Sequence, residues 1–284
     1  MRKSVAASIA ALLAVLALSS VAMAQARGGR RVPEGYIAEG VAKMPNPPGP
    51  APKQDLSGAW VGPQDRVVGP FPAMTPAGEA AFKMNKPYVG FQDLKGKEIP
   101  PANDPFSTCD PLGFPRNLQA AAISFRGGML FGSAPNRTII NYEQQRVWRE
   151  IWMDGTELPK KVDAIGAPDS RYYGYSVGHW DGDNTLVIDT TGFDERAWLD
   201  EQGHLRSSSA HIQERYTRLD QYNMQLTVTV DDPKFYTKPF QFLKANFYWM
   251  KDQTFAETFC IPSEGLEYRD TLAKPSGVNV ENPR

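Results

Sequence analysis

The residues best suited to chemistry gather between positions 198 and 215 of this 284-residue chain. A carboxylate and an imidazole within reach of one substrate can exchange protons with it, which is the basis of general acid–base catalysis. From this segment we take His211, Glu214 and Asp200 as candidate catalytic residues. Trp198 and Arg215 are candidate ligand contacts beside them.

A strand expected over residues 209–219 places Glu214 among apolar neighbours. Successive side chains of a strand point to opposite sides, so Ile212, Glu214 and Tyr216 share one face. A carboxyl on that face has two interpretations. It is either an acid or base whose pKa is raised by burial, or the partner of an arginine on the adjacent strand, such as Arg149. We favour the ion pair.

His211 lies on the opposite, polar face of the same strand, together with Arg215. The inner face of a barrel that holds water or a ligand is often polar, so polarity alone does not decide which face lines the lumen. His211 is either a lumen residue that contacts substrate or an ordinary hydrogen-bonded surface histidine, and we favour the second. For Asp189 on its own strand we expect a position in the lumen and a role in ligand binding.

Metal and cofactor sites have little support in the sequence. The segment Asp181-Gly182-Asp183-Asn184 offers the oxygens that calcium prefers, but it also has the composition of a hairpin turn, which we expect instead. Two cysteines and three histidines without close spacing make a poor zinc site. The chain has no Gly-x-Ser-x-Gly, Walker or dinucleotide motif, which disfavours α/β serine hydrolases and nucleotide-dependent enzymes. We therefore expect no cofactor.

Residues 1–24 have the form of a secretory signal peptide. Arg2 and Lys3 precede an apolar run, and Ala22-Met23-Ala24 has the small-x-small pattern of a cleavage site. We therefore expect a periplasmic or secreted protein, cleaved near Ala24. In an oxidising compartment, an even number of cysteines favours a disulfide between Cys109 and Cys260. Such a bond closes a loop of roughly 150 residues, for which the chain-entropy model gives at most about 5 kcal/mol.

Composition limits the remaining classes of function. The formal net charge is −1, without the basic stripe of a nucleic-acid-binding protein. No second apolar run reaches the ~18 residues that a membrane-spanning helix requires. Residues 25–54 contain five prolines between positions 45 and 52, which indicates an extended, flexible tether. The rest, 55–284, is expected to be a single domain.

The domain is expected to be all-β. In residues 224–230 the apolar side chains alternate with polar ones, as in a half-buried strand. A short helix is expected after Thr75, with Pro76 in its first position. Strands are expected over 138–143, 147–153, 172–180, 185–191, 209–219, 222–231, 239–249 and 254–261. Hairpin-like connections indicate an antiparallel meander, and closing it into a barrel removes the exposed edges.

Aromatic residues are abundant, with six Trp, 11 Tyr and 14 Phe. Many fall on the expected strands, where at least half are expected to fill a core. Trp152 and Tyr175 are further candidate ligand contacts, because Trp and Tyr combine an apolar ring with a polar tip and suit flat, partly polar molecules.

Two resemblances agree with this fold. Gly58-Ala59-Trp60 ahead of the meander resembles the Gly-x-Trp start of lipocalin-type (calycin) barrels. Most of the mature chain resembles a poorly characterised family of exported bacterial proteins, through Cys109-x-Pro-x-Gly-x-Pro-Arg116, Met153-Asp154-Gly155, Ser176-Val-Gly178-x-Trp180-x-Gly182-Asp183, Asp189-Thr-Thr-Gly-Phe193, Trp198-Leu-Asp200, His211-x-x-Glu214-Arg215 and Asp232-Pro-x-x-Tyr236-Thr-Lys-Pro239. The chain departs from that pattern at Tyr175, where a histidine is frequent, and at residues 156–158. The resemblances imply a lipocalin-like barrel and no particular activity.

Three functions of different classes remain. The first is an exported lipocalin-like barrel that binds a small, largely apolar or aromatic molecule. The second is a cofactor-free isomerase, lyase or hydrolase that acts on an aromatic or terpenoid compound by acid–base catalysis. The third is a structural or interaction protein of the cell envelope.

Overall fold

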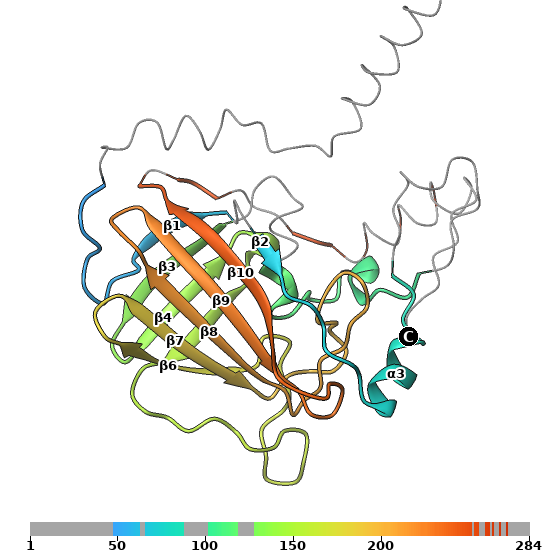
Figure 1. The fold of residues 1–284 in the computed structure, drawn as a ribbon. Coiled ribbons are helices and arrows are strands. Elements are labelled where there is room, and N and C mark those ends of the chain that lie inside the picture. The colour runs from blue at the N-terminus through green and yellow to red at the C-terminus, as the bar shows by residue number, and fades with distance from the viewer. Residues whose placement is uncertain are drawn as a thin grey trace, which may run out of the picture. The chain divides into compact units, whose positions relative to one another are not determined.

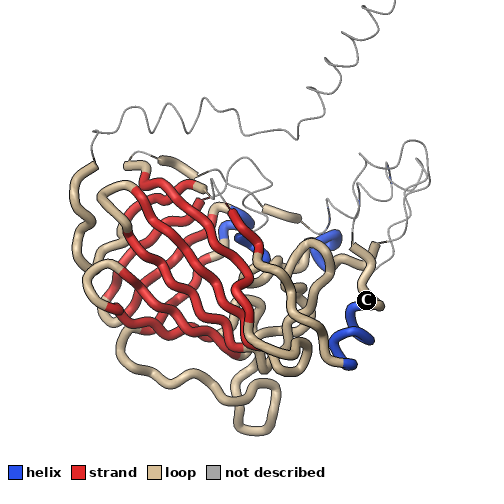
Figure 2. The backbone as a smooth tube through the Cα atoms, viewed as in Figure 1, coloured by secondary structure: helices blue, strands red, loops and turns tan. Residues whose placement is uncertain are grey.

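The computed structural model describes residues 48–62, 66–87, 102–118 and 128–251, with residues 253–255, 259–261, 263, 267 and 271. This part of the chain is built mainly of β-strands, with a short helix, α3 (Pro76–Phe82), beside them (Figures 1 and 2). The strands are β1 (Gly58–Val61), β2 (Arg66–Val68), β3 (Gly128–Ala134), β4 (Arg137–Tyr142), β5 (Trp148–Trp152), β6 (Tyr175–Asp181), β7 (Thr185–Thr191), β8 (His211–Arg218), β9 (Asn223–Asp231) and β10 (Phe240–Trp249).

The sheet closes on itself. Its order is β1-β3-β4-β5-β6-β7-β8-β9-β10, and β10 pairs back onto β1 through Trp60 and Trp249. β2 continues along the same edge of β10 beyond β1, so the closed ring contains nine of the strands described here. The expected all-β barrel is confirmed, and closure leaves the ring without a free edge of the kind that invites aggregation.

One neighbouring pair departs from the expected antiparallel meander. β5 and β6 run parallel and pair only through Ile151 with Ser176 and Trp152 with Val177. Strands that alternate in direction around a ring must be even in number, so a ring of nine requires at least one parallel pair. Parallel neighbours need a long crossover connection, and residues 153–174 supply it. The up-and-down barrels of lipocalins have eight strands, and the finer lipocalin likeness stays an expectation.

Most local predictions match the structure. Strands β4 to β10 fall within the expected ranges or within a residue of them, and Thr75 caps α3 by accepting a hydrogen bond from the N–H of Gly78. The strand expected over 254–261 is wrong for the residues of that range that the structure describes, which are not in a strand. Strand β3 was not expected.

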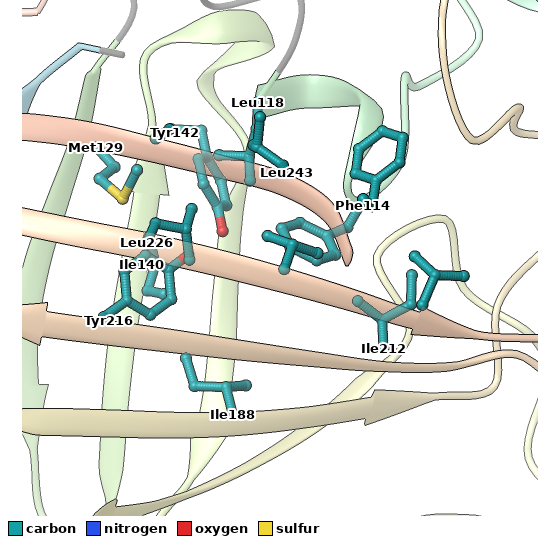
Figure 3. Packing of buried hydrophobic residues seen from close by; sticks show 14 of the residues in the cluster. Phe114, Leu118, Met129, Ile140, Tyr142, Ile188, Ile212, Tyr216, Leu226 and Leu243 are labelled. Carbon is teal, nitrogen blue, oxygen red and sulfur yellow. The ribbon is translucent and has the colours of Figure 1, made fainter. Parts of the chain in front are cut away.

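Side chains fill the inner face of the barrel. The alternation of β9 buries four side chains completely, those of Met224, Leu226, Val228 and Val230. They belong to one cluster with residues from β1, β3, β4, β5, β7, β8 and β10, among them Ile140 and Tyr216 (Figure 3), and Trp180 of β6 packs against it. Phe114 and Leu118 join this cluster from a segment outside the strands (Figure 3).

The N-terminal segment is bound to the barrel from residue 49 onward. Gln221 N–H donates to the Gly49 carbonyl at 2.9 Å, and Gln54 N–H donates to the Asp183 carbonyl at 2.6 Å. The last residues of the expected tether over 25–54 are therefore attached to two hairpin turns of the barrel. Residues 1–47, which include the expected signal peptide and most of the tether, lie outside the described residues.

The expected disulfide is present. Cys109 and Cys260 are bonded, with their Cα atoms 5.3 Å apart and their positions separated by 151 in sequence. The bond ties the chain after β10 to the segment that carries Phe114 and Leu118 into the core. Among the described residues, no helix has the length and apolar character needed to cross a bilayer.

The close approach of β5 and β6 depends on Gly178. A Cβ atom added there would lie 2.7 Å from Ile151 Cγ2 and 2.9 Å from Met153 Sδ. We expect Gly178→Ala to reduce the free energy of unfolding in urea by about 1–3 kcal/mol, the usual cost of overpacking. The control Gly132→Ala places its Cβ where no atom lies within 4 Å, and we expect a change within about 0.5 kcal/mol. Equal losses in the two variants would contradict this explanation.

Candidate functional site

The structure places the three predicted catalytic residues in three separate environments. Glu214 lies inside the barrel, where its Oε1 accepts a hydrogen bond from Arg149 Nη2 at 2.8 Å. The two side chains are 0% and 2% exposed. The favoured interpretation of Glu214 as the partner of Arg149 is therefore what the structure shows.

This ion pair is the centre of a buried polar network. The Arg149 guanidinium also donates to Tyr142 Oη at 2.9 Å, Ser176 Oγ at 2.8 Å and Thr190 Oγ1 at 3.0 Å. Burial raises the pKa of Tyr142 to about 12. Burial opposes the charge of Arg149, but the adjacent Glu214 carboxylate outweighs it and raises the pKa of the guanidinium. The network thus joins side chains of β4 to β8 at one point and holds these strands in register.

His211 and Asp189 pair on the outer face of the barrel. His211 Nε2 lies 2.8 Å from Asp189 Oδ1, and Gln213 Nε2 donates to the same oxygen at 3.1 Å. The hydrogen bond with Asp189 raises the pKa of His211, and the same bond lowers the pKa of Asp189. The expectation that Asp189 lines the lumen is wrong, because its strand turns Ile188 and Thr190 inward instead. Arg215, also on the outside, pairs with Asp181.

Asp200 pairs with His204, which is not among the predicted site residues. Asp200 Oδ2 lies 2.6 Å from His204 Nδ1, and its Oδ1 accepts the backbone N–H of His204 at 3.0 Å. The imidazole is stacked between the rings of Phe71 and Phe82, whose centroids lie 3.8 and 4.8 Å away. A fixed Asp–His pair can act as a base, but the contacts of the described residues show no nucleophile beside His204. Trp198, nearby in sequence, is buried beneath Arg116.

A cleft of about 520 Å³ opens on the outside of the barrel, between β5 and residues 170–176. It forms because β5 and β6 pair through only two residues each, which leaves the start of β5 separate from the chain that leads into β6. The lining is Pro111, Val147, Trp148, Arg149, Glu150, Trp152, Ser170, Arg171, Tyr172, Tyr173, Gly174, Tyr175 and Ser176. Of the five predicted ligand contacts, Trp152 and Tyr175 line this cleft, and Trp198, Arg215 and Asp189 do not.

Both walls of the cleft are fixed by contacts outside it. On the β5 side, the Arg137 guanidinium lies 3.4 Å from the centre of the Trp152 ring. On the facing side, Arg171 N–H donates to the Gly192 carbonyl, and Phe114 N–H donates to the Tyr172 carbonyl. Contacts within the protein itself therefore hold both sides of the cleft in place.

Trp148, Arg171 and Tyr172 were missed as candidate ligand contacts. A local signal exists in Trp148 and Trp152, which are four residues apart and so share the outer face of one strand. The sequence around Tyr172 gives no hint of its partner, because β5 and this segment meet through a parallel contact distant in sequence.

The chain matches no protein-family model, no curated protein and no solved structure. Within the described residues, no group of three or more His, Cys, Asp or Glu side chains is placed to hold a metal ion.

The buried ion pair provides a stability test. Glu214→Gln keeps the shape of the side chain but leaves the Arg149 charge without its counterion, so we expect a loss of about 3–5 kcal/mol in the free energy of unfolding. In the matched control, Asp181→Asn removes the exposed ion pair with Arg215, and we expect a much smaller loss, because water screens exposed ion pairs. Urea unfolding of both variants measures the difference. A loss under 1 kcal/mol for Glu214→Gln would show that the network does not depend on its charge.

The surface pair predicts a pH dependence. The pKa of His211 is raised above 6.5 in the folded protein. Its contribution to the free energy of unfolding is therefore fully present below about pH 6.5 and is lost as the pH rises through the folded-state pKa. The pKa of Asp189 is lowered below 3.8, so its contribution is present above about pH 3.8 and is lost in stronger acid. The coupling free energy from a His211→Asn and Asp189→Asn double-mutant cycle should be largest between these limits. Because both groups are partly exposed, we expect less than about 1 kcal/mol. Stronger coupling at pH 8 than at pH 5 would contradict the assignment.

Proposed function

We propose that this protein binds a small, flat molecule in the cleft between β5 and residues 170–176. The observation that carries the proposal is the lining of the cleft, in which Trp148 and Trp152 lie on one side and Tyr172 and Tyr175 on the other. The core cluster occupies the inner face of the barrel, so we place the ligand outside rather than in the lumen.

The size and chemistry of the cleft fit this class of ligand. Small-molecule sites measure about 300–1,000 Å³ and combine apolar or aromatic walls with a few fixed polar groups. Here the polar groups include Arg149, which four neighbouring side chains immobilise, and the hydroxyl-bearing Ser176. Trp148 is 58% exposed. Covering its ring with a ligand removes apolar surface from water, which favours binding by the usual ~25 cal/mol per Å².

Acid–base catalysis is less well supported than binding. Of the predicted catalytic residues, Glu214 is sealed in the ion pair with Arg149. His211 pairs with Asp189 on the outer face, and Asp200 pairs with His204 between two phenylalanine rings. None of the three lines the cleft. A binding protein requires only the cleft.

We further propose that the chain is exported and belongs to the family of exported bacterial proteins that it resembles. The Cys109–Cys260 disulfide supports an oxidising compartment. The pattern of residues 1–24 supports export.

The binding proposal is tested with a truncated cleft. A screen of aromatic compounds by thermal shift, followed by calorimetry on the best binder, gives the wild-type dissociation constant. Trp148→Ala removes one wall at an exposed position and should weaken binding about tenfold or more, equivalent to about 1.4 kcal/mol. The control Phe259→Ala removes another exposed ring, 65% accessible, that does not line the cleft. Equal dissociation constants for the wild type and Trp148→Ala would show that the compound binds at another site.

A further inference from the structure

Two guanidinium groups, one lining the cleft and one buried near it, have no hydrogen bond to a carboxylate of the described residues. Arg171, on the rim, is exposed and stacks on the ring of Tyr175 at 4.2 Å, and none of the ion pairs between described residues involves it. Arg206 is completely buried, and its Nε and Nη1 have no hydrogen-bond partner among the described atoms. Arg206 Nη2 donates a hydrogen bond to the Asp194 carbonyl oxygen at 3.2 Å.

Arg206 lies behind the tyrosine wall of the cleft. A Cβ atom on Gly113 would be 2.8 Å from the Tyr172 carbonyl oxygen and 3.1 Å from Arg206 Nη2, which places both atoms in one small neighbourhood. Burial lowers the pKa of Arg206 to about 9, so it is still cationic at neutral pH. Tyr173, which lines the cleft, is buried, and the charge of Arg206 acts on its hydroxyl through space.

The carboxylates near these groups are bonded to other residues. Glu214 pairs with Arg149, and Glu150 lies 3.7 Å from Arg137. Asp194 forms its ion pair with Arg196.

Asp232 and Glu195 also attract Arg206 through space. Asp232 accepts hydrogen bonds from Ser207, and Glu195 pairs with Lys234. Arg171, on the rim of the cleft, therefore remains as a guanidinium without an ion-pair partner among the described residues. In a low-dielectric pocket such a charge acts strongly on a bound ion.

We propose that the ligand of the cleft is an aromatic carboxylate, which deepens the proposed function and rests on it. The flat ring packs against Trp148 and Trp152, and the carboxylate accepts hydrogen bonds from the Arg171 guanidinium, whose planar geometry suits a two-oxygen acceptor. Arg206 adds a fixed positive potential from behind the wall. An uncharged flat ligand would use the same walls but would leave both guanidinium groups without a counterion.

The test compares two probes with the same ring, naphthoate and naphthamide, by calorimetry on the full-length mature protein. We expect the carboxylate to bind about tenfold more tightly than the amide, the factor that one charge-assisted hydrogen bond supplies. High salt should reduce this preference, because Arg171 is exposed to solvent. Arg171→Gln should abolish the preference and leave the affinity for naphthamide within about twofold, since the walls are unchanged.

The control Lys244→Gln removes the same charge from an exposed position on β10, away from the cleft, and should keep the preference. Equal binding of both probes to the wild type would overturn the carboxylate proposal and leave the proposed function in place. A preference that survives in Arg171→Gln would also overturn it. Failure of the folded protein to bind either probe would count against the cleft as a binding site, and so against the proposed function itself.

Discussion

The Arg149–Glu214 ion pair is the interaction on which the rest of the barrel depends. Arg149 belongs to β5 and Glu214 to β8, and the strands between them contribute Ser176 and Thr190 to the same guanidinium. Including Tyr142, side chains from five consecutive strands meet at one buried cation. Removing any of these partners leaves a desolvated polar atom, so the network favours one register of the strands over all others.

The cleft lies at the parallel pair that the odd number of strands requires. Because a ring of nine cannot alternate in direction throughout, one pair is parallel, and β5 and β6 meet through only two residues each. Beyond that short contact the two chains separate, and aromatic side chains line the gap. The same constraint requires the crossover over residues 153–174, whose last part forms the second wall. The cleft is thus a direct consequence of barrel closure rather than an addition to it.

The sequence pattern predicted the features that depend on neighbouring residues or on the cost of burying a charge. The alternation in residues 224–230 and the face shared by Glu214 and Tyr216 follow from strand geometry, and the pairing of Glu214 with Arg149 follows from the cost of burying a charge alone. Alternation does not reveal which face turns inward, so Asp189 was placed in the lumen although it lies outside. The parallel contact of β5 with β6 joins segments distant in sequence. Neither it nor the cleft was therefore predictable from neighbouring residues.

Arg149 belongs both to the core network and to the floor of the cleft. In the proposed site, a ligand therefore meets a group whose position is already fixed by the packing of the barrel. The facing wall is fixed as well, through the bond from Arg171 N–H to the Gly192 carbonyl. Binding to such a surface requires little ordering of side chains, and ordering is a main cost of association. In this barrel the packed interior therefore holds the residues that line the outer cleft. In a barrel with an open lumen, fewer side-chain contacts would hold the residues of the binding site in place.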